Sequence, residues 1–151
     1  MTNITVREIL KQAQEIHHRL GEHFLQMASE TEKSRLQMLL NYLQRHESSM
    51  EDSIRTFEEV ARDSLLNTWY PFVPDTDIQK EIEAAQVTVT SSPAELIGAA
   101  IRLDNCLIKL YETMANTAAS EDVRHLFEEL LRLEQKEEYR VVRDTIEVED
   151  L

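Results

Sequence analysis

Glycine and proline are scarce in this sequence. Only two Gly and three Pro occur among its 151 residues. β-Sandwiches, barrels and doubly wound sheets need many tight turns and positive-φ positions, so this composition argues against all three. A chain of this length fits one domain better than two. We therefore expect residues 1–151 to form a single all-α domain of a few long helices.

Cysteine is nearly absent as well. The single Cys106 excludes an internal disulfide and any cysteine-rich zinc module. The first ten residues, MTNITVREIL, show neither the basic segment nor the long apolar run of a secretory signal. These features predict a cytoplasmic protein in a reducing environment, with Cys106 as a buried structural residue.

Basic residues are outnumbered by acidic ones. The sequence has 29 Asp and Glu against 16 Lys and Arg, which gives a formal net charge of -13. A field of this sign repels phosphate backbones and anionic lipid headgroups, so we expect no nucleic-acid partner and no membrane. Neither a glycine-rich phosphate loop nor a nucleophile triad is present, so no nucleotide or flavin cofactor is expected.

Helix start signals divide the chain. A hydroxyl side chain precedes Glu or Gln by three residues at Thr5, Ser29, Thr76 and Ser92, the last with Pro at the first helical position. Ser120, followed by two acidic residues, marks a further start. These signals predict four long helices, at about 5–28, 32–64, 93–117 and 121–146.

Each predicted helix carries an apolar stripe at spacings of three and four residues, which indicates one buried face. In chain order the stripe residues are Ile9, Ala13, Ile16, Leu20, Phe24 and Met27; Leu36, Leu39, Leu40, Leu43, Met50, Ile54, Phe57 and Ala61; Leu96, Ala100, Leu103, Leu107, Leu110, Tyr111 and Met114; and Val123, Phe127, Leu130, Leu131, Val141 and Thr145. We expect these residues to form the core.

The connections predict the topology. Only a few residues separate the first helix from the second and the third from the fourth, so each pair should form an antiparallel hairpin. The crossover between the hairpins, about residues 65–92, is long enough to run from one end of a bundle to the other. It contains the aromatic stretch Trp69–Phe72, a predicted short helix at about 76–85 and an extended segment at 87–90. The aromatic stretch should either fold over an end of the bundle or contact a partner.

A weak internal repeat relates the two hairpins. Residues 14–29 align with 101–116, and residues 35–47 align with 126–138 with four identities. Identities this few arise between any two amphipathic helices, but the alignment also matches the positions at which polar residues interrupt the stripes. The matched pairs are His17 with Asp104, His46 with Glu137, and Leu43 with Glu134.

The polar residues of these pairs lie on the apolar stripes and should point inward. Residues at the same height in an antiparallel hairpin have their midpoint at the turn. The midpoint of His17 and His46 falls near residue 31, and that of Asp104 with Glu134 or Glu137 falls near residue 120, where the turns are expected. Each residue is then about 20 Å from its turn. We expect one buried layer that contains His17, His46, Asp104, Glu134 and Glu137.

With this layer the sequence resembles the ferritin-like superfamily, most closely its rubrerythrin-like branch, whose two helical hairpins hold a dinuclear iron or manganese centre. The family pattern is one Glu from each of two helices and a Glu-x-x-His from each of the other two. The resemblance places Asp104 at a lone Glu, and Glu134-x-x-Glu137 at a Glu-x-x-His. It implies a ferritin-like four-helix bundle for nearly the whole chain.

The first half departs further from the family pattern. His17 stands where the other lone Glu is expected, and Leu43-x-x-His46 keeps the His but lacks the carboxylate. One or two Fe, Mn or Zn ions would suit the mixed nitrogen and oxygen donors. The resemblance implies redox or iron-handling chemistry and a homodimer. Because no Cys-x-x-Cys pair of a rubredoxin-type domain is present, redox chemistry would need an external electron donor.

A metal-free layer is the alternative that the sequence leaves open. Imidazoles and carboxylates can satisfy one another by hydrogen bonds and ion pairs, in a non-catalytic bundle that acts in assembly or protein interaction. Three carboxylates in a low-dielectric interior favour a metal, because without one their pKa values must rise. A surface site at His17, His18 and His23 is not expected, since these residues lie on different faces of the helix. Whether the protein is an enzyme stays open.

Overall fold

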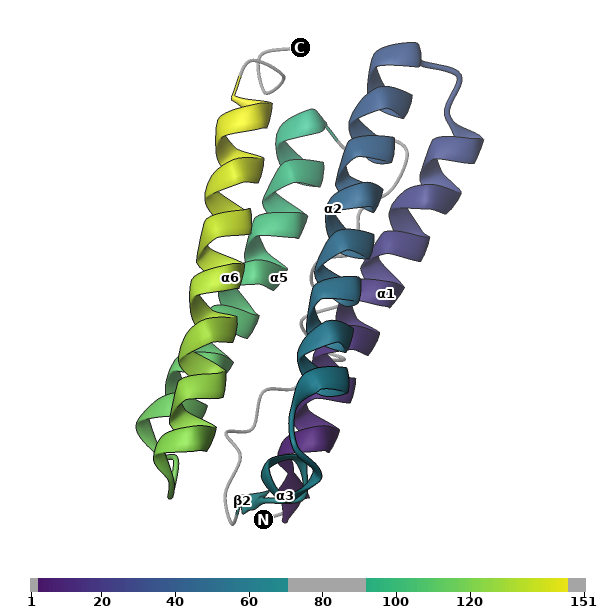
Figure 1. The fold of residues 1–151 in the computed structure, drawn as a ribbon. Helices are drawn as coiled ribbons and strands as arrows, with labels where there is room; N and C mark the ends of the chain where they lie inside the picture. The colour runs from purple at the N-terminus through teal and green to yellow at the C-terminus, as the bar shows by residue number, and fades with distance from the viewer. Residues whose placement is uncertain (1–2, 71–91, 147–151) are drawn as a thin grey trace.

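The computed structural model of the chain describes residues 3–70 and 92–146, and residues 1–2, 71–91 and 147–151 lie outside this part (Figure 1). The described chain is almost entirely helical. Its elements are β1 (Ile4–Thr5), α1 (Val6–Glu30), α2 (Ser34–Val60), α3 (Asp63–Leu66), β2 (Trp69–Tyr70), α5 (Pro93–Asn116) and α6 (Glu121–Thr145). The expected all-α class is confirmed.

The four long helices form two antiparallel hairpins, α1 with α2 and α5 with α6 (Figure 1). The colour order in Figure 1 shows that α1 and α6 run in one direction and that α2 and α5 run in the other. The turns of the two hairpins therefore lie at opposite ends of the molecule. β2 and the start of α5 also lie at opposite ends of the bundle (Figure 1).

Three of the predicted helix starts are confirmed. The Thr5 hydroxyl accepts a hydrogen bond from the backbone N–H three residues on, at 3.2 Å. Ser92 and Glu95 form a reciprocal capping box, with bonds of 3.1 and 2.9 Å, and Pro93 occupies the first helical position. Ser120 caps α6 by accepting a hydrogen bond at 3.3 Å. Each cap satisfies an amide donor that the helix itself leaves unpaired.

The second predicted helix differs from the observed one at both ends. Ser29 does not open it, because α1 continues through Glu30 and the Ser29 hydroxyl donates to a backbone carbonyl one turn earlier. α2 begins at Ser34 and ends at Val60. Extended backbone at Ala61 and Arg62 then separates it from α3, so the single helix expected to residue 64 is interrupted.

A short strand pair closes one end of the bundle. Ile4 pairs with Tyr70 and Thr5 with Trp69, in antiparallel register. Tyr70 is buried, its hydroxyl donates to the Met114 carbonyl oxygen at 2.8 Å, and Trp69 is 62% exposed. Of the aromatic stretch, Tyr70 therefore folds onto the bundle end. The remaining crossover predictions, including the short helix at 76–85 and the extended segment at 87–90, lie outside the described residues.

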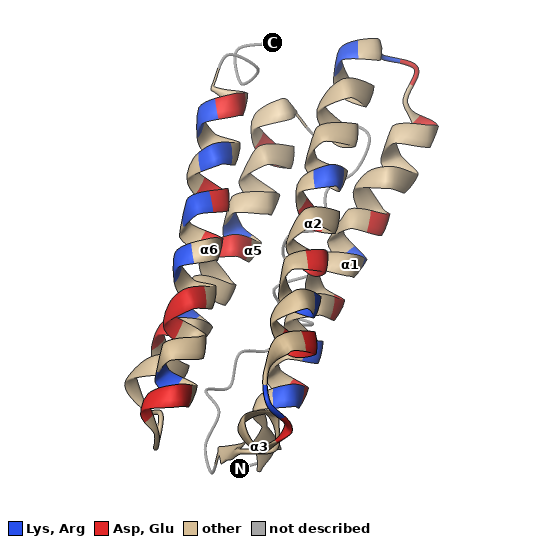
Figure 2. Ribbon diagram, viewed as in Figure 1, with Lys and Arg blue, Asp and Glu red and all other residues tan. Residues whose placement is uncertain are grey.

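The expected stripes form the core. All of their residues are buried except Phe57, Ala61 and Leu131, which are half-buried. Charged residues are distributed along all four long helices (Figure 2). Among the described helices, none combines the length and the apolarity that crossing a membrane requires.

Candidate metal centre

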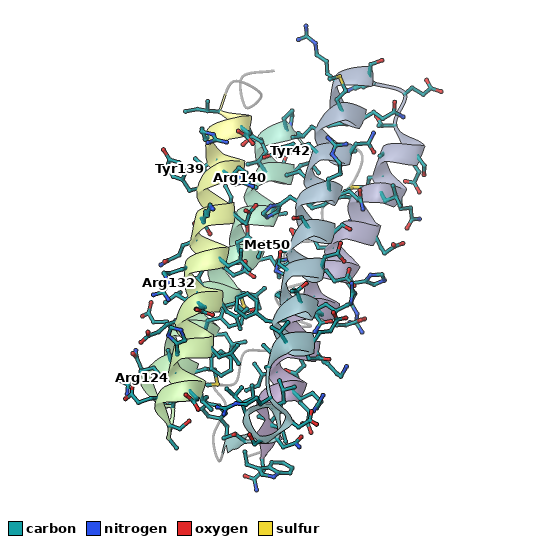
Figure 3. The ribbon with its side chains drawn as sticks, viewed as in Figure 1. Tyr42, Met50, Arg124, Arg132, Tyr139 and Arg140 are labelled. Carbon is teal, nitrogen blue, oxygen red and sulfur yellow. The ribbon has the colours of Figure 1, made fainter. Side chains whose placement is uncertain are left out.

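A layer of ionisable side chains crosses the apolar core near the middle of the bundle. It contains His17 from α1, His46 and Glu47 from α2, Asp104 from α5 and Glu134 from α6. His46 is 7% exposed and the other four are 0% exposed. Figure 3 shows side chains from both hairpins meeting between them, and it labels Met50 of α2 there. We call these five residues the polar layer.

Three hydrogen-bonded contacts lie within the polar layer and form two groups, Glu47–His17–Glu134 and His46–Asp104. His17 Nδ1 lies 2.5 Å from Glu47 Oε2, and His17 Nε2 lies 2.9 Å from Glu134 Oε1. His46 Nε2 lies 3.0 Å from Asp104 Oδ2. The second and third contacts connect one hairpin to the other. A neutral imidazole has one N–H, so His17 donates to both of its carboxylates only when it is protonated.

The surrounding carboxylates favour the protonated imidazoles. Burial by itself lowers the pKa of His17, but the charges and hydrogen bonds of Glu134 and Glu47 outweigh it and raise the pKa well above 6.5. Burial also acts to lower the pKa of His46, whose hydrogen bond and ion pair with Asp104 raise it on balance. Both shifts therefore favour the positively charged imidazole in the metal-free layer.

Positive charge in the polar layer falls short of the negative charge. Burial raises the pKa of Glu47 and of Asp104, although the neighbouring imidazoles act in the opposite direction. Two protonated imidazoles would still leave one of the three carboxylates, Glu47, Asp104 and Glu134, uncompensated. A buried negative charge must be neutralised by a proton or a cation.

Each carboxylate of the polar layer also has an oxygen without a hydrogen-bond partner in the described part of the chain. These atoms are Glu47 Oε1, Asp104 Oδ1 and Glu134 Oε2, and the hydroxyl of the fully buried Tyr111 is unpartnered too. Buried polar atoms are nearly always paired, so an unpartnered oxygen on every carboxylate indicates a missing partner. A bound cation is one kind of partner that compensates buried carboxylate oxygens.

His17, Glu47 and Asp104 could hold a metal ion. Each offers one ligand atom, and these atoms all lie within 4.8 Å of one another. Imidazole nitrogen with carboxylate oxygen is a donor set that suits iron, manganese or zinc. The residues present therefore fit the type of cofactor that the sequence led us to expect, while the identity of the metal stays a prediction.

The structure brings four of the five predicted site residues together. All four are buried, and they form two contacting pairs, His17 with Glu134 and His46 with Asp104. Glu137 has a different partner, since its carboxylate lies 3.1 Å from Arg140 Nη1 and its side chain is 13% exposed. Its role as a ligand stays a prediction that none of these contacts supports.

Sequence reasoning missed Glu47, although two signals for it were present. Glu47 lies four residues after Leu43 and three before Met50, on the apolar stripe of α2. It is also identical to Glu138 in the alignment of 35–47 with 126–138. Glu47 thus contributes a buried carboxylate from α2, one turn after Leu43.

No protein-family model, no curated protein and no solved structure matches this chain. The fold and the polar layer nevertheless define a class of molecule. That class is an all-α bundle of two helical hairpins with a buried histidine–carboxylate layer.

Proposed function

We propose that this protein is a ferritin-like bundle that binds a divalent metal ion through His17, Glu47 and Asp104. The observation that carries the proposal is the unpartnered oxygen on each buried carboxylate of the polar layer. Glu134 and His46 contact two of the three proposed ligands and would hold them in place. Partners of this kind fix the orientation of metal ligands.

The helix directions support the ferritin-like part of the proposal. Two hairpins whose turns lie at opposite ends need one long crossover, which is a connection used by ferritin-like folds (Figure 1). All four long helices contribute to the polar layer, as in the metal centres of that class. The chain matches that class in the arrangement of its helices. It differs in the donor set, which has fewer carboxylates than the family pattern.

A bound iron or manganese ion would supply one-electron redox chemistry, and a zinc ion would supply Lewis acidity. The residues of this chain would bind the ion, exclude bulk water and release their displaced protons to solvent. His17 must release a proton from the nitrogen that binds the metal, because only a neutral imidazole nitrogen can ligate. Redox turnover and iron handling, an external electron donor and a homodimer belong to this proposal as expectations.

A metal-free structural layer is the second candidate. Both nitrogens of His17 and one nitrogen of His46 already have carboxylate partners, which favours mutual satisfaction without an ion. In that case the bundle would act in assembly or protein interaction, and protonation would neutralise the third carboxylate. The two candidates predict opposite results in a metal-binding experiment.

Metal content and metal-dependent stability distinguish the candidates. Full-length protein without a His-tag should be purified, analysed for bound elements, and melted with and without Fe(II), Mn(II) or Zn(II) under anaerobic conditions. An ion that binds only the folded state stabilises it by about 2.7 kcal/mol at a hundredfold excess over Kd. The Asp104→Asn variant should lose this rise in Tm. Absence of bound metal together with an unchanged Tm would establish the metal-free layer.

A further inference from the structure

Any ion that reaches the proposed centre must leave bulk water on the way. Four of the five residues in the polar layer are 0% exposed, and His46 is only 7% exposed. Removing the hydration shell of a divalent cation in a single step costs much free energy, because an ion loses its solvation energy on burial. A partly exposed carboxylate beside the layer would divide this cost into two steps.

Glu138 lies at such a position. It follows Glu134 by four residues on α6, so the two side chains project from the same face of the helix. Glu134 is fully buried and Glu138 is half-buried. When the side-chain amide of Asn105 is oriented with its nitrogen toward Glu138, this nitrogen donates to both carboxylate oxygens of Glu138, at 2.5 and 3.1 Å. Asn105 is exposed and is adjacent to the buried Asp104, so this contact lies at the border of the layer.

The electrostatics of Glu138 also connect it with the interior. Burial raises its pKa, and the charges of Asp104 and Glu134 raise it further, while His46 acts in the opposite direction. The carboxylate of Glu138 therefore interacts electrostatically with the buried carboxylates of Asp104 and Glu134 while it remains partly exposed to solvent. The preceding residue, Glu137, instead forms an ion pair with Arg140.

We propose that Glu138 is a relay carboxylate, which binds a hydrated divalent cation from solvent and passes it to the buried ligand Asp104 as its waters are removed. The inference rests on the proposed metal-binding function. Glu138 in this role governs the rate of loading rather than the final affinity, because the ion leaves it for the buried ligands. Negative charge along an access path raises the association rates of cations about tenfold or more.

The test is the rate at which chelator-treated, full-length protein takes up Co(II), followed by stopped-flow absorption. Glu138→Gln removes the charge and keeps the shape, and should slow loading at least about tenfold. Its equilibrium affinity and stoichiometry for Co(II) should stay within about threefold of the parent values. Glu138→Asp keeps the charge and should load at a rate near that of the parent.

Glu58→Gln is the matched control. Glu58 is also half-buried, but it contacts Lys11 and Gln14 and lies about 16 Å along α2 from Glu47. Equal loading rates for the Glu138→Gln and Glu58→Gln variants would overturn the relay, as would a lower Co(II) stoichiometry at Glu138→Gln, which would make Glu138 a ligand. A parent protein that binds no Co(II) would instead overturn the proposed function, and the relay with it.

Discussion

A β-carbon placed on Gly21 would lie 3.2 Å from the Cβ of Glu47, which is closer than ordinary van der Waals contact. Gly21 is buried in the middle of α1, and Glu47 is buried on α2. The missing side chain at Gly21 therefore makes room for α2 at the height of the polar layer. One of only two glycines in the chain occupies this position.

Alanine at the two glycines should have different effects. Gly98 is an exposed residue of α5 with nothing within 4 Å of an added Cβ, so Gly98→Ala should raise the free energy of unfolding by about 0.5–1 kcal/mol through helix propensity. Gly21→Ala should gain less, since Glu47 must move, and it should weaken Zn(II) binding. Urea unfolding and calorimetric titration measure the two effects. Equal stabilisation at both sites with unchanged Zn(II) affinity would contradict the role assigned to Gly21.

Glu47 and Glu137 offer a direct comparison between the ligand that the structure shows and one that the sequence predicted. Glu47→Gln should lower the affinity for Zn(II) by about tenfold to a hundredfold or more. Losses of this size follow when a residue that only supports a metal ligand is removed, so removal of a ligand itself should cost at least as much. Glu137→Gln should leave the affinity nearly unchanged, because that carboxylate pairs with Arg140. Calorimetry on both variants, each checked for helicity by circular dichroism, gives the answer. A larger loss at Glu137 would restore the prediction from the sequence.

The metal-free protein should lose stability as the pH rises. The pKa values of His17 and His46 are raised above 6.5, and those of Glu47 and Asp104 above 4.5 and 3.8, so the folded state binds protons more tightly than the unfolded state. The stabilisation from the imidazoles is complete below pH 6.5 and is lost as the pH rises through their folded pKa values. The carboxyls change stability in the same direction, starting at lower pH.

Urea unfolding in the presence of a chelator measures this dependence. The free energy of unfolding should be lower at about pH 8.5 than at about pH 6, because the folded state loses its more tightly bound protons as the pH rises. His17→Gln should reduce the difference. With Zn(II) in excess the dependence should weaken or reverse, because the metal competes with protons for the same groups. Greater stability of the chelator-treated protein at the higher pH would count against a protonated polar layer.

Two buried tyrosines should respond differently to loss of the hydroxyl group. The Tyr111 hydroxyl has no hydrogen-bond partner among the described residues, whereas that of Tyr70 donates to the Met114 carbonyl oxygen. Tyr111→Phe should therefore be neutral or should stabilise the metal-free protein by about 1 kcal/mol, and Tyr70→Phe should destabilise it by about 1 kcal/mol. Phe24 occupies the position that matches Tyr111 in the internal repeat, so a phenyl ring suits this place in the core. Thermal melts of both variants make the comparison, and destabilisation by Tyr111→Phe would reveal a partner for its hydroxyl.

The sequence predicted the parts of this protein that depend on local interactions. Caps at Thr5, Ser92 and Ser120 set the starts of three helices, because a helix terminus needs partners for its free amides. The three- and four-residue spacing identified the core, since that spacing places side chains on one face. The same periodicity placed His17 and Asp104 in the interior.

Tertiary structure decided which acidic side chains enter the polar layer. Spacings of three and four both fit one helix face, so the sequence could not separate Glu134, which is buried, from Glu137, which reaches Arg140. Glu47 lies on the apolar stripe of α2, but the partner that makes its burial stable is His17 of another helix, 2.5 Å away. Burial of a carboxylate is stable only when a partner compensates its desolvation. That partner lies 30 residues away along the chain, and only the close approach of α1 and α2 beside Gly21 brings it into contact.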